Sequence, residues 1–413
     1  MDQNIDSISQ PRQEVMKTDL RLLVVLSTLM AFAAISTDLY LPALPRMSAA
    51  LGASQGTLEL TITGYLIGFT LGQLFWGPVG DRYGRRGPVA LGLIVFVIGS
   101  AGCALSTDAW QLIGWRVVQA LGACASVVLA RAIVRDLFER DRAARLLSTL
   151  MTIMAIAPLL GPSVGALILK VASWQAIFWT LVLIGLATLA ALSTLQETLP
   201  PERRNTEPLS RAFLGYTSLL GNRRLLGYAG AVGFFYSGVF AYIAGSPFAY
   251  IDYHRLSPQL YGVLFAVGII GLMVSNTVNA RLVTRFGSDR LLLIGTIGAA
   301  LAGVIVALVG ATDFAGLFGL AAALCLYVAM NGFIAANAIS GALVDFPKRA
   351  GAVSALLGAI QYGSGIIGSA VSSTFADGTP WPMAWVIALS GIGSLLSMRL
   401  ITSRPKTASR YPR

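Results

Sequence analysis

The sequence predicts an all-α membrane protein, with twelve transmembrane helices in two six-helix pseudo-repeat halves. Three observations support this: the composition, the spacing of apolar runs and the placement of positive charge. Of 413 residues, 55% are hydrophobic and 12% charged, and the mean hydropathy is +0.72. A soluble domain carries about 25% charged residues. Apolar runs of about 20 residues, enough to cross a bilayer, recur along the chain. A soluble bundle, whose helices would keep a polar face, is disfavoured.

The apolar runs place the twelve spans in order. The first six are 20–46, 57–77, 88–106, 109–132, 143–169 and 174–196. The polar stretch ETLPPERRNTEPLSR follows, and then the second six at 224–250, 258–283, 290–311, 314–344, 350–375 and 380–401. The predicted organisation is a cytoplasmic N-terminal tail (1–19), an N-terminal half (20–196), a cytoplasmic linker (197–223), a C-terminal half (224–401) and a basic cytoplasmic tail (402–413).

Local signals mark the ends of individual spans. Pro42, Pro45 and Arg46 indicate the outer end of the first span, because proline cannot continue a helix. Interfacial tryptophans mark outward helix starts, and they are Trp110, Trp174 and Trp381. The polar first 19 residues do not resemble a cleavable signal peptide, so we expect the first span to remain.

Positive charge is unevenly distributed between the connections. With a cytoplasmic N-terminus, about 26 of the 30 lysines and arginines fall on the cytoplasmic side, which is what the positive-inside rule requires. The outward connections hold only Arg46, Lys170 and Arg255. The net charge of +11 therefore reflects orientation in a membrane, not binding to nucleic acid.

The cysteines indicate neither disulfides nor a metal site. Cys103, Cys124 and Cys325 all lie inside apolar runs, without metal-ligand spacing. We expect them to act as small packing residues. The chain has no GxxxxGK[ST] loop for ATP and no apparent catalytic set, so we expect no enzyme activity, no metal and no cofactor other than protons as the coupling ion.

A glycine-rich basic segment, GPVGDRYGRRG (77–87), follows the second span. Its glycines allow a tight turn and close helix approach, and its arginines favour an anionic membrane surface. Asp81 follows a helix C-terminus, where the dipole disfavours it, so it needs a partner such as an arginine. A plain topogenic loop is the alternative. TRFGSDR (284–290) repeats Arg–aromatic–Gly after the eighth span. The candidate conformational lock is Gly77, Asp81, Arg82, Gly84, Arg85 and Arg86.

The fifth span contains APLLGPSVGA (157–166). Pro158 and Pro162 each remove a helical hydrogen bond and bend the helix. Gly161 and Gly165, four residues apart, allow a neighbouring backbone to pack closely. A bent, tightly packed helix without a specific role is the alternative interpretation.

Two charged residues lie inside spans, where an ion needs a partner or a function. Asp38 is eight residues inside Arg46, which puts it about 12 Å below the outer face at 1.5 Å per residue. Arg116 is seven residues inside Ala109, at about the same depth. The hypothesis is that both face one cavity and pair, directly or through water, in one protonation state. Snorkelling of Arg116 to the interface is the alternative.

A mostly apolar cavity with few polar anchors would suit lipophilic molecules. Each aromatic, methionine or polar candidate could equally face lipid or pack. The candidate substrate-lining residues are Thr37, Leu41, Ile62, Tyr65, Gln119, Leu150, Met154, Tyr236 and Phe240. Glu59 opens the second span. It is either a vestibule acid that attracts cations or an interfacial carboxylate favoured by the helix dipole.

These motifs resemble those of a known family. The 77–87 segment resembles the signature loop of the major facilitator superfamily, and the resemblance covers essentially the whole chain. It implies that Asp81 contacts the eleventh span near 350–354 and locks the outward-facing state, whereas the second copy, with Thr284, locks more weakly. The span 5 pattern resembles the antiporter signature of drug/proton exchangers. Arg116-x-x-Gln119 resembles a span 4 motif whose arginine takes part in proton coupling.

Three further segments resemble the bicyclomycin-resistance (Bcr/CflA) subfamily of drug/proton antiporters: STDLYLPALP, ETLPPERR and AGSPFAYI. That group exports bicyclomycin, phenicols, sulfonamides and, in some members, cysteine. Met30 stands where broader relatives carry a second acid, which disfavours divalent or strongly cationic drugs.

The expected function is proton-coupled drug efflux by alternating access, with Asp38 as proton carrier coupled to Arg116. A metabolite exporter, for example of cysteine, and a nutrient importer are the alternatives. We expect a functional monomer in the bacterial inner membrane, surrounded by lipid, with both termini cytoplasmic and small-molecule drugs as its substrates.

Overall fold

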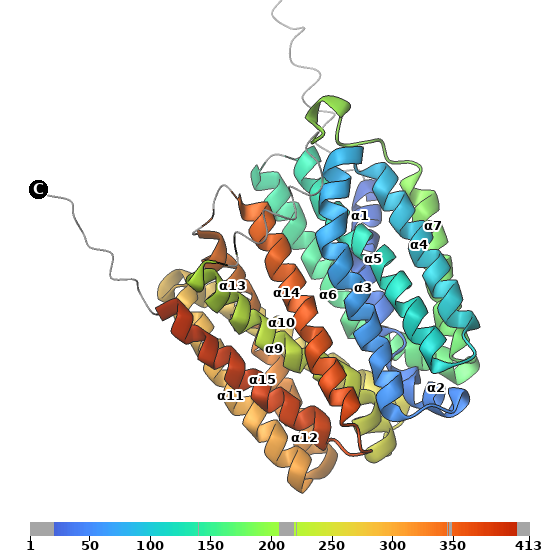
Figure 1. Ribbon diagram of the computed structural model, residues 1–413, viewed down its shortest axis with the longest axis vertical. Helices are drawn as coiled ribbons and strands as arrows, with labels where there is room; N and C mark the ends of the chain where they lie inside the picture. The colour runs from blue at the N-terminus through green and yellow to red at the C-terminus, as the bar shows by residue number, and fades with distance from the viewer. Residues whose placement is uncertain are drawn as a thin grey trace, which may run out of the picture.

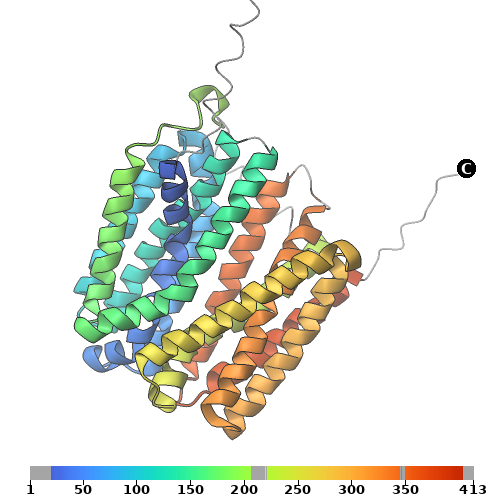
Figure 2. The same cartoon turned by 180° about the vertical axis from the view of Figure 1, so that it is seen from behind.

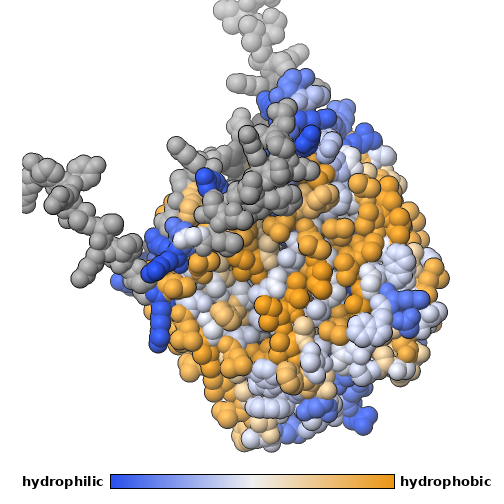
Figure 3. All heavy atoms as spheres, viewed as in Figure 1, coloured by the Kyte–Doolittle hydropathy of each residue, from blue (hydrophilic) through white to orange (hydrophobic). Residues whose placement is uncertain are grey.

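Figure 1 shows the computed structural model, which describes residues 20–138, 140–205, 219, 221–344, 346 and 349–402. The predicted tails 1–19 and 403–413, and most of the linker, lie outside the described residues. Twelve helical segments are long and apolar enough to cross a membrane, as the sequence predicts. On the face seen in Figure 3, hydrophilic residues gather mainly at two ends and leave a largely apolar middle.

The two predicted halves form two groups of helices, blue to green and yellow to red (Figure 2). The N-terminal half comprises α1 (Leu20–Asp38), η2 (Leu41–Ala43), α2 (Leu44–Leu51), α3 (Gln55–Tyr83), α4 (Arg86–Leu105), α5 (Ala109–Leu137), α6 (Arg140–Val171) and α7 (Gln175–Leu192). The short η3 (Pro201–Arg203) follows. The C-terminal half comprises α9 (Arg223–Pro247), η4 (Phe248–Tyr253), α10 (Pro258–Phe286), α11 (Ser288–Thr312), α12 (Gly316–Ala329), α13 (Asn331–Val344), α14 (Ala350–Thr374) and α15 (Trp381–Thr402).

Several helices begin at the side-chain caps that their sequences provide. Ser54 Oγ accepts a hydrogen bond from Thr57 N at the start of α3, and Asp108 does the same for Trp110 N and Gln111 N at α5. Asn222 and Ser257 cap α9 and α10 in the same way. These caps satisfy amide groups that a helix start leaves without a partner.

Three predicted elements differ from the structure. The first span is not one continuous helix: α1 ends at Asp38, and η2 and α2 each carry a proline as their second residue, Pro42 and Pro45, whose missing N–H suits a helix start. The segment 77–83 is not a loop, because α3 continues through Pro78 to Tyr83. The tenth span divides at Met330 into α12 and α13. The seventh span is found where it was predicted, with a change from α-helix to π-helix after Pro247.

The predicted repeat has a conformational counterpart in the backbone. Gly84, after α3, has φ +93°, and Gly287, after α10, has φ +78°. Both glycines end an Arg–aromatic–Gly segment and adopt a conformation that L-residues rarely take. The same local turn therefore occurs once in each half.

The halves meet along two helix pairs, α3 with α14 and α6 with α10. We call the end that holds Arg85, Arg204, Arg224 and Arg285 the basic end, and the other the opposite end. Two hydrogen bonds between described residues join the halves toward the opposite end. Thr63 and Ser369 share a hydrogen bond of 2.8 Å, and Gln259 Nε2 donates to the Ala166 carbonyl at 3.4 Å.

Candidate functional site

Asp38 lies where α1 ends, at the middle of the first span. Its side chain is only 5% exposed. The backbone around it packs against the predicted bend in α6: a Cβ at Gly161 would lie 3.0 Å from Asp38 Cβ, and one at Gly165 would overlap the Leu39 carbonyl oxygen. The predicted close approach at these two glycines is confirmed. Pro158 and Pro162 both lie inside α6.

Arg116 lies fully buried in α5, so it does not snorkel to the interface. Its Nη1 donates to the Ser36 carbonyl at 3.0 Å and to Gln119 Oε1. Its guanidinium carbon lies 4.2 Å from the ring centroid of Tyr40 and 4.4 Å from that of Tyr65. The charge is therefore stabilised by two aromatic faces and two acceptors.

The arginine site extends one step further, through Gln119. Gln119 Nε2 donates to Ser100 Oγ of α4 at 2.8 Å. Gln119 is fully buried within the N-terminal half, so it positions Arg116 instead of lining an open wall. The expected shared face of Arg116 and Gln119 is confirmed.

Asp38 and Arg116 are neighbours without being an ion pair. No contact within 4.0 Å joins the two charged groups, while Arg116 binds the backbone of Ser36, two residues before Asp38. The Arg116 charge still acts on Asp38. Arg116 Nε and Nη2 are buried and have no hydrogen-bond partner. Direct pairing is thus absent from this conformation, and pairing through water, or in another protonation state, stays a prediction.

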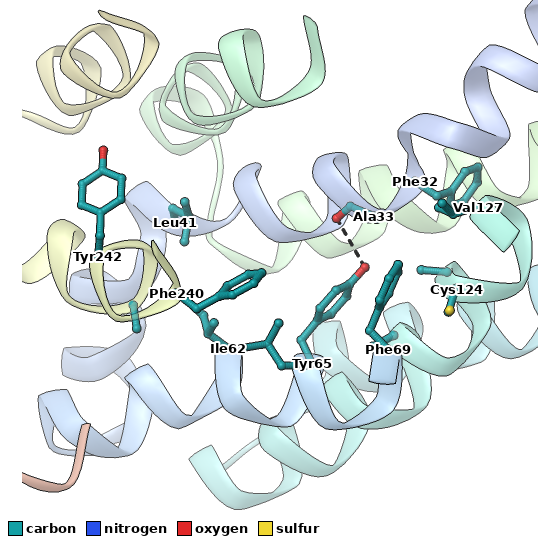
Figure 4. Close-up of a cluster of buried hydrophobic side chains, with 14 of the residues drawn as sticks. Phe32, Ala33, Leu41, Ile62, Tyr65, Phe69, Cys124, Val127, Phe240 and Tyr242 are labelled. Carbon is teal, nitrogen blue, oxygen red and sulfur yellow. Dashed lines mark hydrogen bonds between the residues drawn. The ribbon is translucent and has the colours of Figure 1, made fainter. Parts of the chain in front are cut away.

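An aromatic bridge joins the two halves beside this site. Phe69 of α3 and Tyr362 of α14 have ring centroids 4.4 Å apart, and Tyr362 is 5.8 Å from Phe240 of α9. Tyr65 and Tyr236 extend the bridge at its two ends, at 6.1 Å and 6.2 Å. Figure 4 shows Phe240 reaching toward Ile62 and Tyr65, with Leu41 nearby.

The structure therefore brings together part of the predicted lining set. Tyr65, Tyr236 and Phe240 belong to the aromatic bridge, and Ile62 lies beside Phe240 and Tyr65 (Figure 4). Leu150 is as buried as Ile62, but it lies on α6, outside the bridge. Thr37 is buried and bonds its own helix, at the Ala33 carbonyl. Leu41 is buried in η2, and Met154 packs partly buried on the core. Their contact with substrate stays a prediction.

Sequence reasoning missed several residues of this site. Tyr40, Phe69 and Tyr362 were not singled out, although Phe69 follows Tyr65 by one turn. On the C-terminal side, Tyr242 and Tyr261 lie within electrostatic range of Asp38. No local pattern marks these tyrosines, because their roles arise from contacts between distant segments.

An apolar opening lies between the halves in the part nearer the basic end. Its volume is about 620 Å³, and its wall comprises Met151 of α6 with Ala336, Ile339, Ser340, Leu343 and Val344 of α13. Met151, next to the predicted Leu150, is thus the α6 residue at this wall. Among the described residues, this opening lies nearer the basic end, whereas the hydrogen bond between Thr63 and Ser369 joins α3 to α14 toward the opposite end.

The predicted lock centres on Arg85. Arg85 Nη1 contacts Asp81 Oδ1 at 2.6 Å, and Arg85 Nε contacts Asp136 Oδ2 of α5 at 2.7 Å. The prediction that Asp81 needs an arginine partner is confirmed. The contact of Asp81 with the eleventh span stays a prediction. Arg82 lies over the Tyr83 ring at 5.7 Å, and Arg86 Nη2 donates to the Ser193 carbonyl at 3.0 Å.

Glu197, from the segment ETLPPERR, contacts the backbone of the predicted lock. Its carboxylate accepts the backbone amides of Arg85 at 2.7 Å and Arg86 at 3.1 Å, at the start of α4. A negative charge is favoured at a helix N-terminus. Partial burial alone would raise the pKa of Glu197, but hydrogen bonds from four backbone amides hold this pKa below its ordinary value of 4.5.

The lock glycines are not equivalent. A Cβ at Gly84 would lie 2.6 Å from Glu197 Oε2, so that position requires glycine for space as well as for its φ. A Cβ at Gly77 would meet nothing within 4 Å. The expectation that Gly77 allows a close approach was wrong, because no described neighbouring segment reaches this side of α3 at Gly77.

Glu59 lies elsewhere than either interpretation placed it. It is 1% exposed, between α3 and the C-terminal half, so it is neither an interfacial carboxylate nor an open vestibule acid. Within the described residues, no group of three acidic, histidine or cysteine side chains could hold a metal ion.

Comparison with known proteins identifies the family. The sequence model of the Major Facilitator Superfamily matches residues 26–369. The chain belongs to the major facilitator superfamily. Superfamily members are transporters, so the protein is a multi-pass membrane transporter and not an enzyme.

Three bacterial relatives have 31–34% identity to the chain. An uncharacterised MFS-type transporter, YdgK, of Bacillus subtilis is 34% identical, over 94% of this chain and 97% of its own. A bicyclomycin resistance protein homolog of Haemophilus influenzae is 31% identical, over 89% and 92%. A chloramphenicol resistance protein of Pseudomonas aeruginosa is 31% identical, over 87% and 85%.

A solved structure supports the major facilitator fold. The xylose transporter XylE from E. coli superposes with a TM-score of 0.73 at 16% sequence identity, covering 94% of this chain and 99% of that one. This similarity concerns the fold alone.

Proposed function

We propose that this transporter exports small lipophilic or zwitterionic drugs in exchange for protons, by alternating access. The observation that carries the proposal is Asp38: a buried acid at a helix break, free of any ion pair, next to a buried arginine with two unbound nitrogens. Such an acid can bind a proton without breaking an ion pair, and the neighbouring Arg116 charge can stabilise it after the proton has left. The drug-resistance names of two relatives support the direction of transport.

The proposed orientation puts the basic end in the cytoplasm of a bacterial inner membrane, in accordance with the positive-inside rule. The apolar opening beside Met151 then faces inward, and the closed contact of α3 with α14 faces outward. A drug enters through this opening, and the aromatic bridge binds its apolar surface. No resident cofactor is needed, and the bilayer with a single copy of the chain suffices.

In the proposed cycle, Asp38 receives a proton from the outside while the halves are open outward. After closure toward the outside, the bound proton and the bound drug exclude each other, so drug binding near the aromatic bridge displaces the proton from Asp38 to the cytoplasm. When Asp38 is ionised, Arg116 is the nearest charge that can stabilise it. Bicyclomycin, phenicols and sulfonamides are the proposed substrates.

Export of a small metabolite such as cysteine is the second candidate. The subfamily resemblance favours it, because some members export cysteine. An importer of sugars is less consistent with the wall at Met151, where five of the six wall residues are apolar. Sugar sites need many hydrogen-bonding side chains.

Everted membrane vesicles test the proposal. Respiration acidifies their interior, which a fluorescent pH probe reports, and bicyclomycin, chloramphenicol, a sulfonamide and cysteine are added separately. We expect at least one drug to discharge the gradient in wild-type vesicles and none to do so in Asp38→Asn. The matched control is Asp377→Asn, an exposed acid outside the site, which should behave like wild type.

Two results would overturn this assignment. If no compound discharges the gradient with folded wild-type protein, the antiporter assignment for these substrates fails. If Asp38→Asn responds like wild type, the proton is carried elsewhere. A response to cysteine alone would favour the metabolite exporter.

A further inference from the structure

Glu59 lies on the face of α3 that packs against α14. Gly56, Glu59 and Thr63 share this face, since they are three and seven residues apart. On one side of Glu59, a Cβ at Gly56 would overlap the Ser373 carbonyl. On the other, Thr63 bonds Ser369 at 2.8 Å. The acid is thus enclosed by the contact that closes the opposite end.

The carboxyl group of Glu59 is only half satisfied there. Gln55 Nε2 donates to its Oε1 at 2.8 Å. The Ser373 hydroxyl lies beside the carboxyl group, but it donates to the Ser369 carbonyl at 2.6 Å, and Oε2 is buried without a hydrogen-bond partner of its own. The space around it is too small to hold a water molecule. An unpaired buried carboxylate is strongly disfavoured, whereas the protonated acid is neutral.

Among the described residues, none of those that line the space around Glu59 carries a positive charge. The remaining wall comes from α3, α9, α14, the turn 375–380 and α15, and its residues are Gln55, Gly245, Ser372, Ala376, Thr379, Pro380, Pro382 and Met383. None is titratable. Asp377, in the same turn, is exposed, and its carboxylate accepts hydrogen bonds from Thr379 N and Oγ1.

We propose that Glu59 is a second proton-binding site, which holds its proton while the outward contact is closed and releases it to outside water when that contact opens. The inference rests on the orientation in the proposed function. Opening separates α3 from α14 and hydrates the carboxylate, so the open state favours the ion and the closed state the neutral acid. External acid then favours closure.

A capping role does not account for this position. The cap of α3 is Ser54, and Glu59 is the fifth residue of the helix, beyond the first turn in which the dipole acts. A cap would also point its oxygens at free amides, whereas Glu59 Oε1 binds the Gln55 side chain.

Electron paramagnetic resonance distances between the halves test the proposal with the full chain in lipid nanodiscs. Spin labels replace Thr107, between α4 and α5, and Thr312, the last residue of α11, in a Cys325→Ala background. Both residues are exposed, and both lie at the opposite end of the molecule. The pH is varied from 5 to 9. We expect the open-to-closed ratio of wild type to rise with pH, by at most about tenfold per pH unit for one linked proton.

Glu59→Gln, which mimics the neutral acid in shape, should remain closed and lose most of this pH dependence. Asp377 lies in the turn 375–380 beside Glu59 but is exposed to water, so Asp377→Asn should keep the pH dependence of wild type. An equal pH response in wild type and Glu59→Gln would overturn the proposal. Glu59→Asp, which restores a shorter acid, should recover part of the response.

The outcome is separable from that of the proposed function. The Glu59-dependent pH response should persist when it is measured in the Asp38→Asn variant. In that variant Asp38 cannot contribute to the response, so what remains belongs to Glu59. A protein that exports none of the tested drugs but shows this response would retain the gate and lose the substrate assignment. Loss of the response in Asp38→Asn would assign it to Asp38 instead and refute the role of Glu59.

Discussion

Replacing Arg116 by lysine separates the charge of this residue from its geometry. Lysine keeps the positive charge and the length to reach one acceptor. It cannot lie flat between the rings of Tyr40 and Tyr65, nor bind the Ser36 carbonyl and Gln119 together in the same way.

The magnitude follows from the contacts that are lost. One hydrogen bond from a charged donor contributes about 1.5 to 3 kcal/mol. Each ring contact of a desolvated cation contributes about 0.5 to 2 kcal/mol. We therefore expect Arg116→Lys to lower the free energy of unfolding by about 2.5 to 7 kcal/mol, with Gln119 left partly unsatisfied.

Thermal unfolding in detergent and the vesicle assay measure the two consequences. The matched control is Arg290→Lys, the same change at an exposed arginine, which should shift neither quantity. Arg116→Lys should melt earlier and discharge the proton gradient more slowly than wild type when drug is added. If it matches wild type in both, charge alone accounts for Arg116, and the stacking between tyrosines is without consequence.

Two further predictions concern the bend in α6 and the lock. Gly165→Ala should lower the free energy of unfolding by about 1 to 3 kcal/mol, because its Cβ overlaps the Leu39 carbonyl. The control Gly77→Ala, in open space within α3, should be neutral or stabilising. Equal shifts of the melting temperature in the two variants would contradict this packing argument. The depressed pKa of Glu197 means that its stabilisation of the start of α4 is complete above the unfolded pKa and is lost as the pH falls through the folded pKa, below 4.5. Hydrogen exchange should therefore show the Arg85 and Arg86 amides losing protection below that pH. Glu197→Gln should show weaker protection of these amides, with little pH dependence. If this variant protects them as well as wild type does, the Glu197 carboxylate does not stabilise the start of α4.

Prediction from sequence succeeded where the controlling interaction is local or set by the membrane. The spans follow from bilayer thickness, and Gly161 and Gly165 follow from helical spacing. It failed at the first span, where a run apolar enough to be one helix breaks after Asp38. It also failed at Gly77, because a glycine before a basic segment resembles a turn whether or not the helix continues.

The sequence by itself determined the twelve spans, the two halves, the basic end and the presence of an acid and an arginine at matching depth. These depend on hydrophobic length, charge placement and residue spacing, which are properties of consecutive residues. Only the tertiary structure decided that Arg116 lies between two tyrosines, that Glu197 holds the start of α4 and that Glu59 is enclosed between the halves. Each of these depends on which distant segments meet, because burial and hydrogen bonding across helices are properties of the packed chain.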